Sequence, residues 1–104
     1  MKSKIKAIIK RPDEQYGHST WISPKLENFQ NTVGGYIETV QLPNGVVCIC
    51  NEEGKLKGLE ENMRIPGDVL VGTIILCGTS GEDFGDIPIT FAAWKQYCDV
   101  CARG

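Results

Sequence analysis

Cysteine is the residue type in this chain whose number and spacing are most open to chemistry. The 104 residues include five cysteines. Cys48 and Cys50 form a C-x-C pair, and Cys98 and Cys101 form a C-x-x-C pair. Zinc prefers thiolate ligands and takes four of them in a tetrahedron. The two pairs together therefore predict a structural zinc site.

The same spacing also suits two other uses of the thiols. Cysteine is among the most often buried residue types, so all five thiols are equally explained as small core side chains. A redox pair is disfavoured, because Cys98 and Cys101 end the expected last helix beside Asp99, whereas a reactive thiolate is favoured where a helix begins. We expect Cys77, at the end of an apolar run, to lie in the core. His18 lies in a polar stretch, where we expect it to be solvated rather than a ligand.

Patterns typical of catalysis are missing from the sequence. There is one histidine, no G-x-S-x-G motif, and no glycine-rich phosphate loop before an expected helix. The adjacent carboxylates of Glu52 and Glu53 fall in a glycine-containing turn, where such pairs are usually solvated. We therefore expect a protein without enzymatic activity.

Charge is divided unevenly along the chain. Residues 1–11 carry a net charge of +5, and the remaining residues carry −7. Nucleic-acid-binding domains are usually basic, so the overall charge of −2 argues against direct contact with nucleic acid and suits a basic protein partner. The alternative is a DNA contact through the basic residues 2–11, although five bases on one strand also describe a solvated sheet edge.

Candidate partner-binding residues lie within the acidic stretch 52–86. Phe84 stands among acids there, and an exposed aromatic side chain often anchors an interface. The other reading is that Phe84 packs back onto the core. The candidate set consists of Glu60, Glu61, Glu82, Asp83, Phe84 and Asp86.

The length and composition predict one domain over residues 1–104, in a reducing cytoplasm and without a membrane partner. No apolar run approaches the ~18 residues that span a bilayer. The opening string MKSKIKAIIKRP lacks the apolar core and cleavage site of a signal peptide.

The first half of the chain predicts a strand, a helix and a hairpin. Residues 4–10 alternate apolar and lysine side chains, which indicates a strand near a sheet edge, and residues 21–22 offer a brief pairing. Ser23 and Pro24 mark a helix start, and Gly34 marks its end. Asn44-Gly45 predicts a two-residue hairpin turn that sets Leu42 opposite Val47.

In that hairpin Cys48 and Cys50 share one face, because strand side chains alternate. Residues 51–67 are polar, with one helical turn expected near 60–62. Residues 68–77 predict a buried central strand, 78–86 an acidic loop, and 88–103 a final helix capped by Thr90.

The order β-α-β-β-β-α predicts an α+β fold with a small, mostly antiparallel sheet, a central hairpin and two packed helices. The last helix carries one apolar stripe of Phe91, Trp94, Cys98 and Cys101. If that stripe covers the thiol face of the hairpin, the four cysteines converge.

Two strings, VGGYIETVQLPNGVVCICNEEGKLKGL (33–59) and GDVLVGTIILCG (67–78), resemble a small domain family of unknown function carried by phages, prophages and conjugative elements of Gram-positive bacteria. The resemblance covers about residues 4–97. It implies a small α+β accessory protein without enzymatic activity. The cysteines of both pairs replace aliphatic or polar residues of the family, which favours either a metal in this member or tolerant core substitution.

With these cysteines the chain is also similar to zinc-containing anti-CRISPR proteins that act on the type II RNA-guided nuclease. That similarity implies a phage or prophage inhibitor of host defence, which binds the nuclease in the host cytoplasm. The alternative is a sponge for a signalling nucleotide of host immunity. Such a sponge needs a pocket with cationic and aromatic side chains, for which Arg64, Trp21 and Tyr36 are available.

Overall fold

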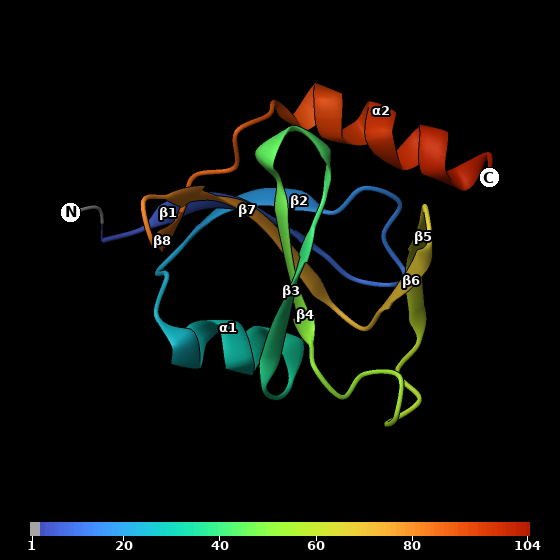
Figure 1. Ribbon diagram of the computed structural model, residues 1–104, viewed down its shortest axis with the longest axis horizontal. Coiled ribbons are helices and arrows are strands. Elements are labelled where there is room, and N and C mark those ends of the chain that lie inside the picture. The colour runs from blue at the N-terminus through green and yellow to red at the C-terminus, as the bar shows by residue number, and fades with distance from the viewer. Residues whose placement is uncertain (1–2) are drawn as a thin grey trace.

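Six strands form one antiparallel sheet with a helix on each face in the computed structural model, which describes residues 3–104 (Figure 1). The strand order is β2-β1-β7-β4-β3, with β8 paired to β7, while β5 and β6 form a separate hairpin. The elements are β1 (Ile5–Lys10), β2 (His18–Ile22), α1 (Leu26–Val33), β3 (Ile37–Gln41), the 3-10 turn η1 (Pro43–Gly45), β4 (Val47–Asn51), β5 (Glu61–Ile65), β6 (Asp68–Val71), β7 (Ile74–Ser80), β8 (Asp83–Gly85) and α2 (Phe91–Ala102). The predicted α+β class is confirmed.

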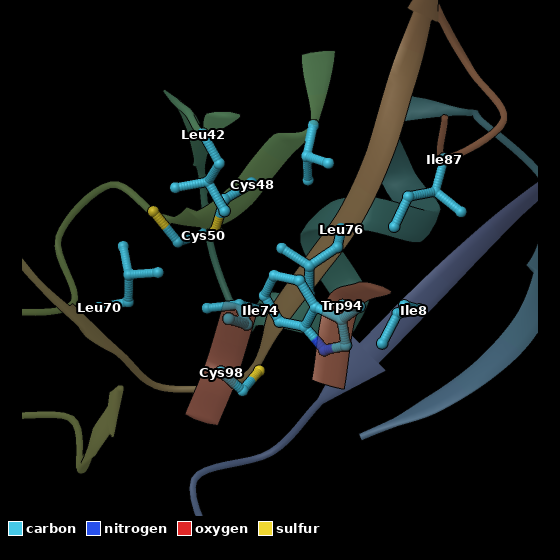
Figure 2. Close-up of a cluster of buried hydrophobic side chains, with 11 residues drawn as sticks. Ile8, Leu42, Cys48, Cys50, Leu70, Ile74, Leu76, Ile87, Trp94 and Cys98 are labelled. Carbon is cyan, nitrogen blue, oxygen red and sulfur yellow. The ribbon is translucent and has the colours of Figure 1, made fainter. Parts of the chain in front are cut away.

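The sheet separates two apolar cores. Phe29 and Val33 of α1 pack against one face, together with Ile75 and Cys77 of β7. The other core lies under α2. It is built from Ile8, Leu42, Val46, Cys48, Cys50, Leu70, Ile74, Leu76, Ile87, Trp94 and Cys98 (Figure 2). Because β1, β7 and β4 contribute to both cores, the central strands are covered on both faces.

The lysines of residues 4–10 predicted a strand near a sheet edge, and β1 is the second strand of the sheet, next to the edge strand β2. β1 pairs with β2 on one side and with β7 on the other. Lys6 is exposed, but Lys10 at the end of the strand is buried, with 3% of its surface accessible. The alternation of apolar residues and lysines correctly placed Lys10 on the same face of the strand as Lys6. It could not show that other elements of the fold cover this face near Lys10.

Helix α1 begins later than predicted and ends where predicted. Lys25 keeps an extended backbone before the first helical residue, so Ser23 and Pro24 are not its cap. Ser23 instead accepts a hydrogen bond from Asn28 Nδ2 through its carbonyl. Gly34 closes the helix in the left-handed conformation, at φ 82°, which costs glycine little.

The hairpin register predicted from Asn44-Gly45 is wrong by one residue. Leu42 N donates to Val46 O, so the loop holds three residues rather than two. Val40 therefore lies opposite Cys48 instead of Ile49. A slip of one position exchanges the faces, so Val40 and Leu42 join Cys48 in the core under α2. The shared face of Cys48 and Cys50 is confirmed.

The predicted helical turn near residues 60–62 is wrong, because β5 begins there and pairs with β6. The predicted strand 68–77 is two strands. Gly72, at φ 73°, breaks it between β6 and the buried, central β7. The hairpin of β5 and β6 consequently stands apart from the main sheet (Figure 1).

The expected acidic loop 78–86 also contains structure, since Gly78–Ser80 pair with Asp83–Gly85 of β8. A Cβ on Gly78 would lie 2.3 Å from Asp86 O, so this position requires glycine. The last helix is confirmed: Thr90 Oγ1 accepts from Ala93 N at 3.1 Å, and Trp94 and Cys98 are buried. Within residues 3–104, neither helix could cross a membrane.

Phe29→Ala tests the core beneath α1. Phe29 is fully buried and meets Phe84 edge-to-face, with ring centroids 5.2 Å apart. We expect the variant to lose about 3–5 kcal/mol of unfolding free energy in urea titration, because the cavity replaces most of these contacts. Leu26→Ala is the control on the same helix, since Leu26 is 56% exposed and should change stability little. Equal effects of the two substitutions would contradict this packing.

Candidate functional site

Four of the five cysteines lie on the α2 side of the sheet. Cys48 and Cys50 of β4 and Cys98 of α2 belong to the same buried cluster under α2 (Figure 2). Cys101 is half-buried near the end of α2. Cys77 lies on the opposite face, in the core under α1, as expected. The last helix therefore does cover the thiol face of the hairpin.

Cys48 and Cys50 interact with each other. A hydrogen bond between the two thiols raises the pKa of Cys48 well above its ordinary value, with burial as the next cause, and lowers the pKa of Cys50. The Cys50 thiol also lies 3.9 Å from Glu38 Oε1. On α2, burial raises the pKa of Cys98 to about 12. Cys48 and Cys98 are thus held as neutral thiols.

The two cysteine pairs do not assemble into one ligand cluster. Within residues 3–104, no three His, Cys, Asp or Glu side chains group closely enough to hold a metal ion. In the view of Figure 2, the side chain of Ile74 lies between Cys98 and the β4 pair. His18 is exposed on β2 beside Glu14, at 3.4 Å. Zinc binding is not tested by this arrangement and stays a prediction.

Elemental analysis of the native protein tests the zinc prediction. A structural zinc ion predicts about one zinc per chain, and a large loss of melting temperature in Cys48→Ser. Cys77→Ser is the matched control, because Cys77 lies on the other face. Zinc near zero, with Cys48→Ser and Cys77→Ser equally stable, would show that the thiols serve only as core side chains.

The predicted partner-binding residues do not share one surface. Glu60 and Glu61 lie at the start of β5, whereas Glu82 and Asp83 lie at the turn between β7 and β8. Figure 1 shows these two regions at opposite ends of the long axis. Nearness in sequence between residues 52 and 86 therefore does not make a single acidic patch.

Two of those residues also contribute to the fold. Phe84 is half-buried and stacks edge-to-face on Phe29, so it packs onto the core. Asp86 is half-buried and accepts a hydrogen bond from Lys6 N at 2.9 Å. The alternative prediction, that Phe84 packs back onto the core, is confirmed.

A groove lies between α2 and the β5–β6 hairpin and has a volume of about 1210 Å³. We call it the α2 groove. It is open to solvent and mostly apolar. Its apolar side chains include Met63, Ile65, Val69 and Val71 from the hairpin and Val100 from α2. Cys98, Cys101 and Glu61 also line it, so part of the predicted site belongs to this groove.

Lys10 is the buried cation of the α2 groove. Its Nζ donates to Asn62 Oδ1 at 2.7 Å. Asn62 Nδ2 donates to Lys10 O and to Gly72 O, both at 2.8 Å. This amide therefore joins the end of β1 to the hairpin. Burial lowers the pKa of Lys10, while Cys98 and Glu14 act in the opposite direction.

Tyr16 fixes the neighbouring wall to α2. Its hydroxyl donates to Asp99 Oδ1 at 2.7 Å, and its carbonyl accepts from Trp94 Nε1 at 2.8 Å. The bond to Asp99 raises the pKa of Tyr16. Lys95 Nζ lies 5.4 Å from the centre of the Tyr16 ring. These contacts hold the loop between β1 and β2 against the helix.

The other charged groups around the α2 groove are already engaged. Lys55 forms an ion pair with Asp68, and Arg64 forms one with Glu61. Glu14 accepts from Arg11 N at 2.8 Å and lies beside His18. Within residues 3–104, Lys10 has no carboxylate within ion-pair distance. It is thus the groove cation without a counter-ion.

The family model described as a domain of unknown function, DUF3846, matches residues 5–100. The chain belongs to the DUF3846 family. No curated protein and no solved structure matches the chain. The match to this DUF3846 domain includes β1, the hairpin and most of α2, so every wall of the α2 groove lies at least partly within it.

Raising the pH should destabilise this DUF3846 domain through its buried thiols. Burial raises the pKa of Cys77 from 9.0 to about 12, so the folded state keeps a proton that the unfolded chain releases above pH 9. The unfolded state then binds fewer protons, and stability falls as pH rises from 9 toward 12, by about 1 kcal/mol for this thiol at pH 10.

Cys77→Val removes one such thiol while keeping its size. Urea titrations between pH 7.5 and 10, under reducing conditions, should show a shallower loss of stability in Cys77→Val than in the wild type. Parallel curves would contradict the assignment of this pH dependence to Cys77.

Proposed function

We propose that this chain is a non-enzymatic binding protein that holds a segment of a partner protein in the α2 groove. The observation that carries the proposal is the size and lining of the groove. Pockets for small molecules usually measure about 300–1,000 Å³. A mostly apolar, open groove of about 1210 Å³ is better suited to a length of polypeptide.

We further propose that the partner is a host-defence protein and that the chain is an accessory protein of a phage or another mobile element. The type II RNA-guided nuclease in the host cytoplasm is the partner to test first. Two features of the sequence support it: the resemblance of residues 33–59 and 67–78 to accessory proteins of mobile elements, and the acidic balance outside residues 1–11. Such nucleases carry strongly basic channels.

The small net charge restricts how an inhibitor of this kind would act. A charge of −2 is far too little to imitate a DNA duplex, which carries one negative charge per about 1.7 Å. The two acidic regions at opposite ends of the molecule do not form one continuous surface either. We therefore propose a focused contact centred on the α2 groove rather than occupation of the nucleic-acid channel.

A nucleotide sponge is the second candidate function, because Lys10, Lys55 and Arg64 line the α2 groove together with Tyr16. Cations and an aromatic ring are the groups that bind phosphates and bases. Trp21 and Tyr36, which the sequence had offered for this role, do not line the groove. A rise in melting temperature with cyclic dinucleotides, and none with adenosine, would favour the sponge.

Val100→Arg tests the proposed binding surface. Val100 is 60% exposed and lines the groove from α2, so an arginine there should obstruct an apolar segment. We expect about a tenfold loss of affinity for a purified type II nuclease in pull-down and titration experiments. Leu26→Arg is the matched control, because Leu26 is 56% exposed on α1 at the opposite face.

The possible outcomes test the identity of the partner and the location of the contact surface separately. Failure of the wild type to bind the nuclease would reject that partner. Binding that Leu26→Arg weakens and Val100→Arg does not would reject the α2 groove as the contact surface.

A further inference from the structure

The buried ammonium of Lys10 gives the α2 groove a chemical preference. An ammonium group has three N–H donors. Asn62 Oδ1 accepts one of them at 2.7 Å. Within residues 3–104, the Lys10 ammonium has no second hydrogen-bond acceptor. Two donors are therefore left, on a side chain that lines the groove.

The nearest acidic groups do not form an ion pair with the Lys10 ammonium. Glu14 lies near enough to influence Lys10, but its carboxylate accepts from Arg11 N and faces His18. Cys98 also lies near Lys10, and its thiol is buried in the core under α2. Asp99 accepts from the Tyr16 hydroxyl. A buried charge without a partner is costly, so an anionic group of an occupant would be favoured at this point.

From this arrangement we infer that the α2 groove binds an extended apolar peptide segment that carries a carboxylate, and that this carboxylate bonds to Lys10. The inference rests on the proposed function, because it names the partner segment that the groove accepts. The apolar side chains of Met63, Ile65 and Val100 would contact the flanking residues of the segment. A charge-assisted bond at a buried site is stronger than one between neutral groups, so the carboxylate would determine the register of the segment.

Two peptide pools that differ in one group test this inference. Both are acetylated hexapeptide amides with Leu, Ile, Val, Met and Phe randomised at five positions. The third position is aspartate in one pool and asparagine in the other. Binding to the whole chain is followed by amide NMR shifts and by displacement of a fluorescent aspartate peptide. We expect about tenfold tighter binding of the aspartate pool to the wild type.

Lys10→Met removes the cation and keeps much of the side-chain volume. In this variant the two pools should bind equally. Lys4→Met is the matched control, because Lys4 is an exposed lysine just before β1, and it should keep the preference for aspartate.

The wild type alone gives a second readout, in case Lys10→Met does not fold. The side-chain NH₂ resonances of Asn62 should shift more with the aspartate pool than with the asparagine pool, because Asn62 Oδ1 shares the Lys10 ammonium with the occupant.

The results distinguish the role of Lys10 from the use of the α2 groove as a peptide site. Equal binding of both pools to the wild type, with shifts in groove residues, would overturn the role of Lys10 and leave the groove as a peptide site. Absence of shifts in groove residues with either pool would overturn both. A preference for aspartate that survives in Lys10→Met would place the carboxylate on another cation and contradict the inference.

Discussion

One half-buried amide, that of Asn62, joins the two parts of this molecule. Asn62 donates to Lys10 O and Gly72 O and accepts from Lys10 Nζ, so three hydrogen bonds connect the end of β1, the hairpin and the passage into β7. Leu70 adds an apolar contact by reaching into the core under α2. Both N–H donors and the oxygen of the Asn62 amide are hydrogen-bonded, and a side chain bonded in this way holds one arrangement of its neighbours. The position of the hairpin, and with it the α2 groove, depends on this amide.

Much of the fold could be predicted from the periodicity of the sequence. The apolar stripe and Thr90 cap of α2, the left-handed end of α1, and the common face of Cys48 and Cys50 follow from local rules and are present. The errors arise where one residue decides a turn. The hairpin loop closes over three residues instead of two, and Gly72 divides one apolar run into two strands. The energy differences between such turns are small, and tertiary packing chooses among them.

The candidate site was harder to predict because its parts are distant in sequence. Lys10 and Asn62 are 52 positions apart, and nothing in the alternation of β1 shows that its last lysine is covered. A lysine at the end of a strand next to a break is the available signal, and it is equally typical of a solvated edge. The acidic residues show the reverse, since Glu61 and Asp83 fall within one acidic stretch of the sequence and lie at opposite ends of the molecule.

Hydrogen exchange of Asn62→Ala tests the central role of this amide most directly. If Asn62 fixes the hairpin to the sheet, the amide protons paired between β5 and β6 should lose at least about tenfold in protection, while those paired between β4 and β7 should keep theirs. Asn31→Ala, at an exposed position of α1, should leave both sets unchanged. Hairpin protection in Asn62→Ala equal to that of the wild type would contradict the account.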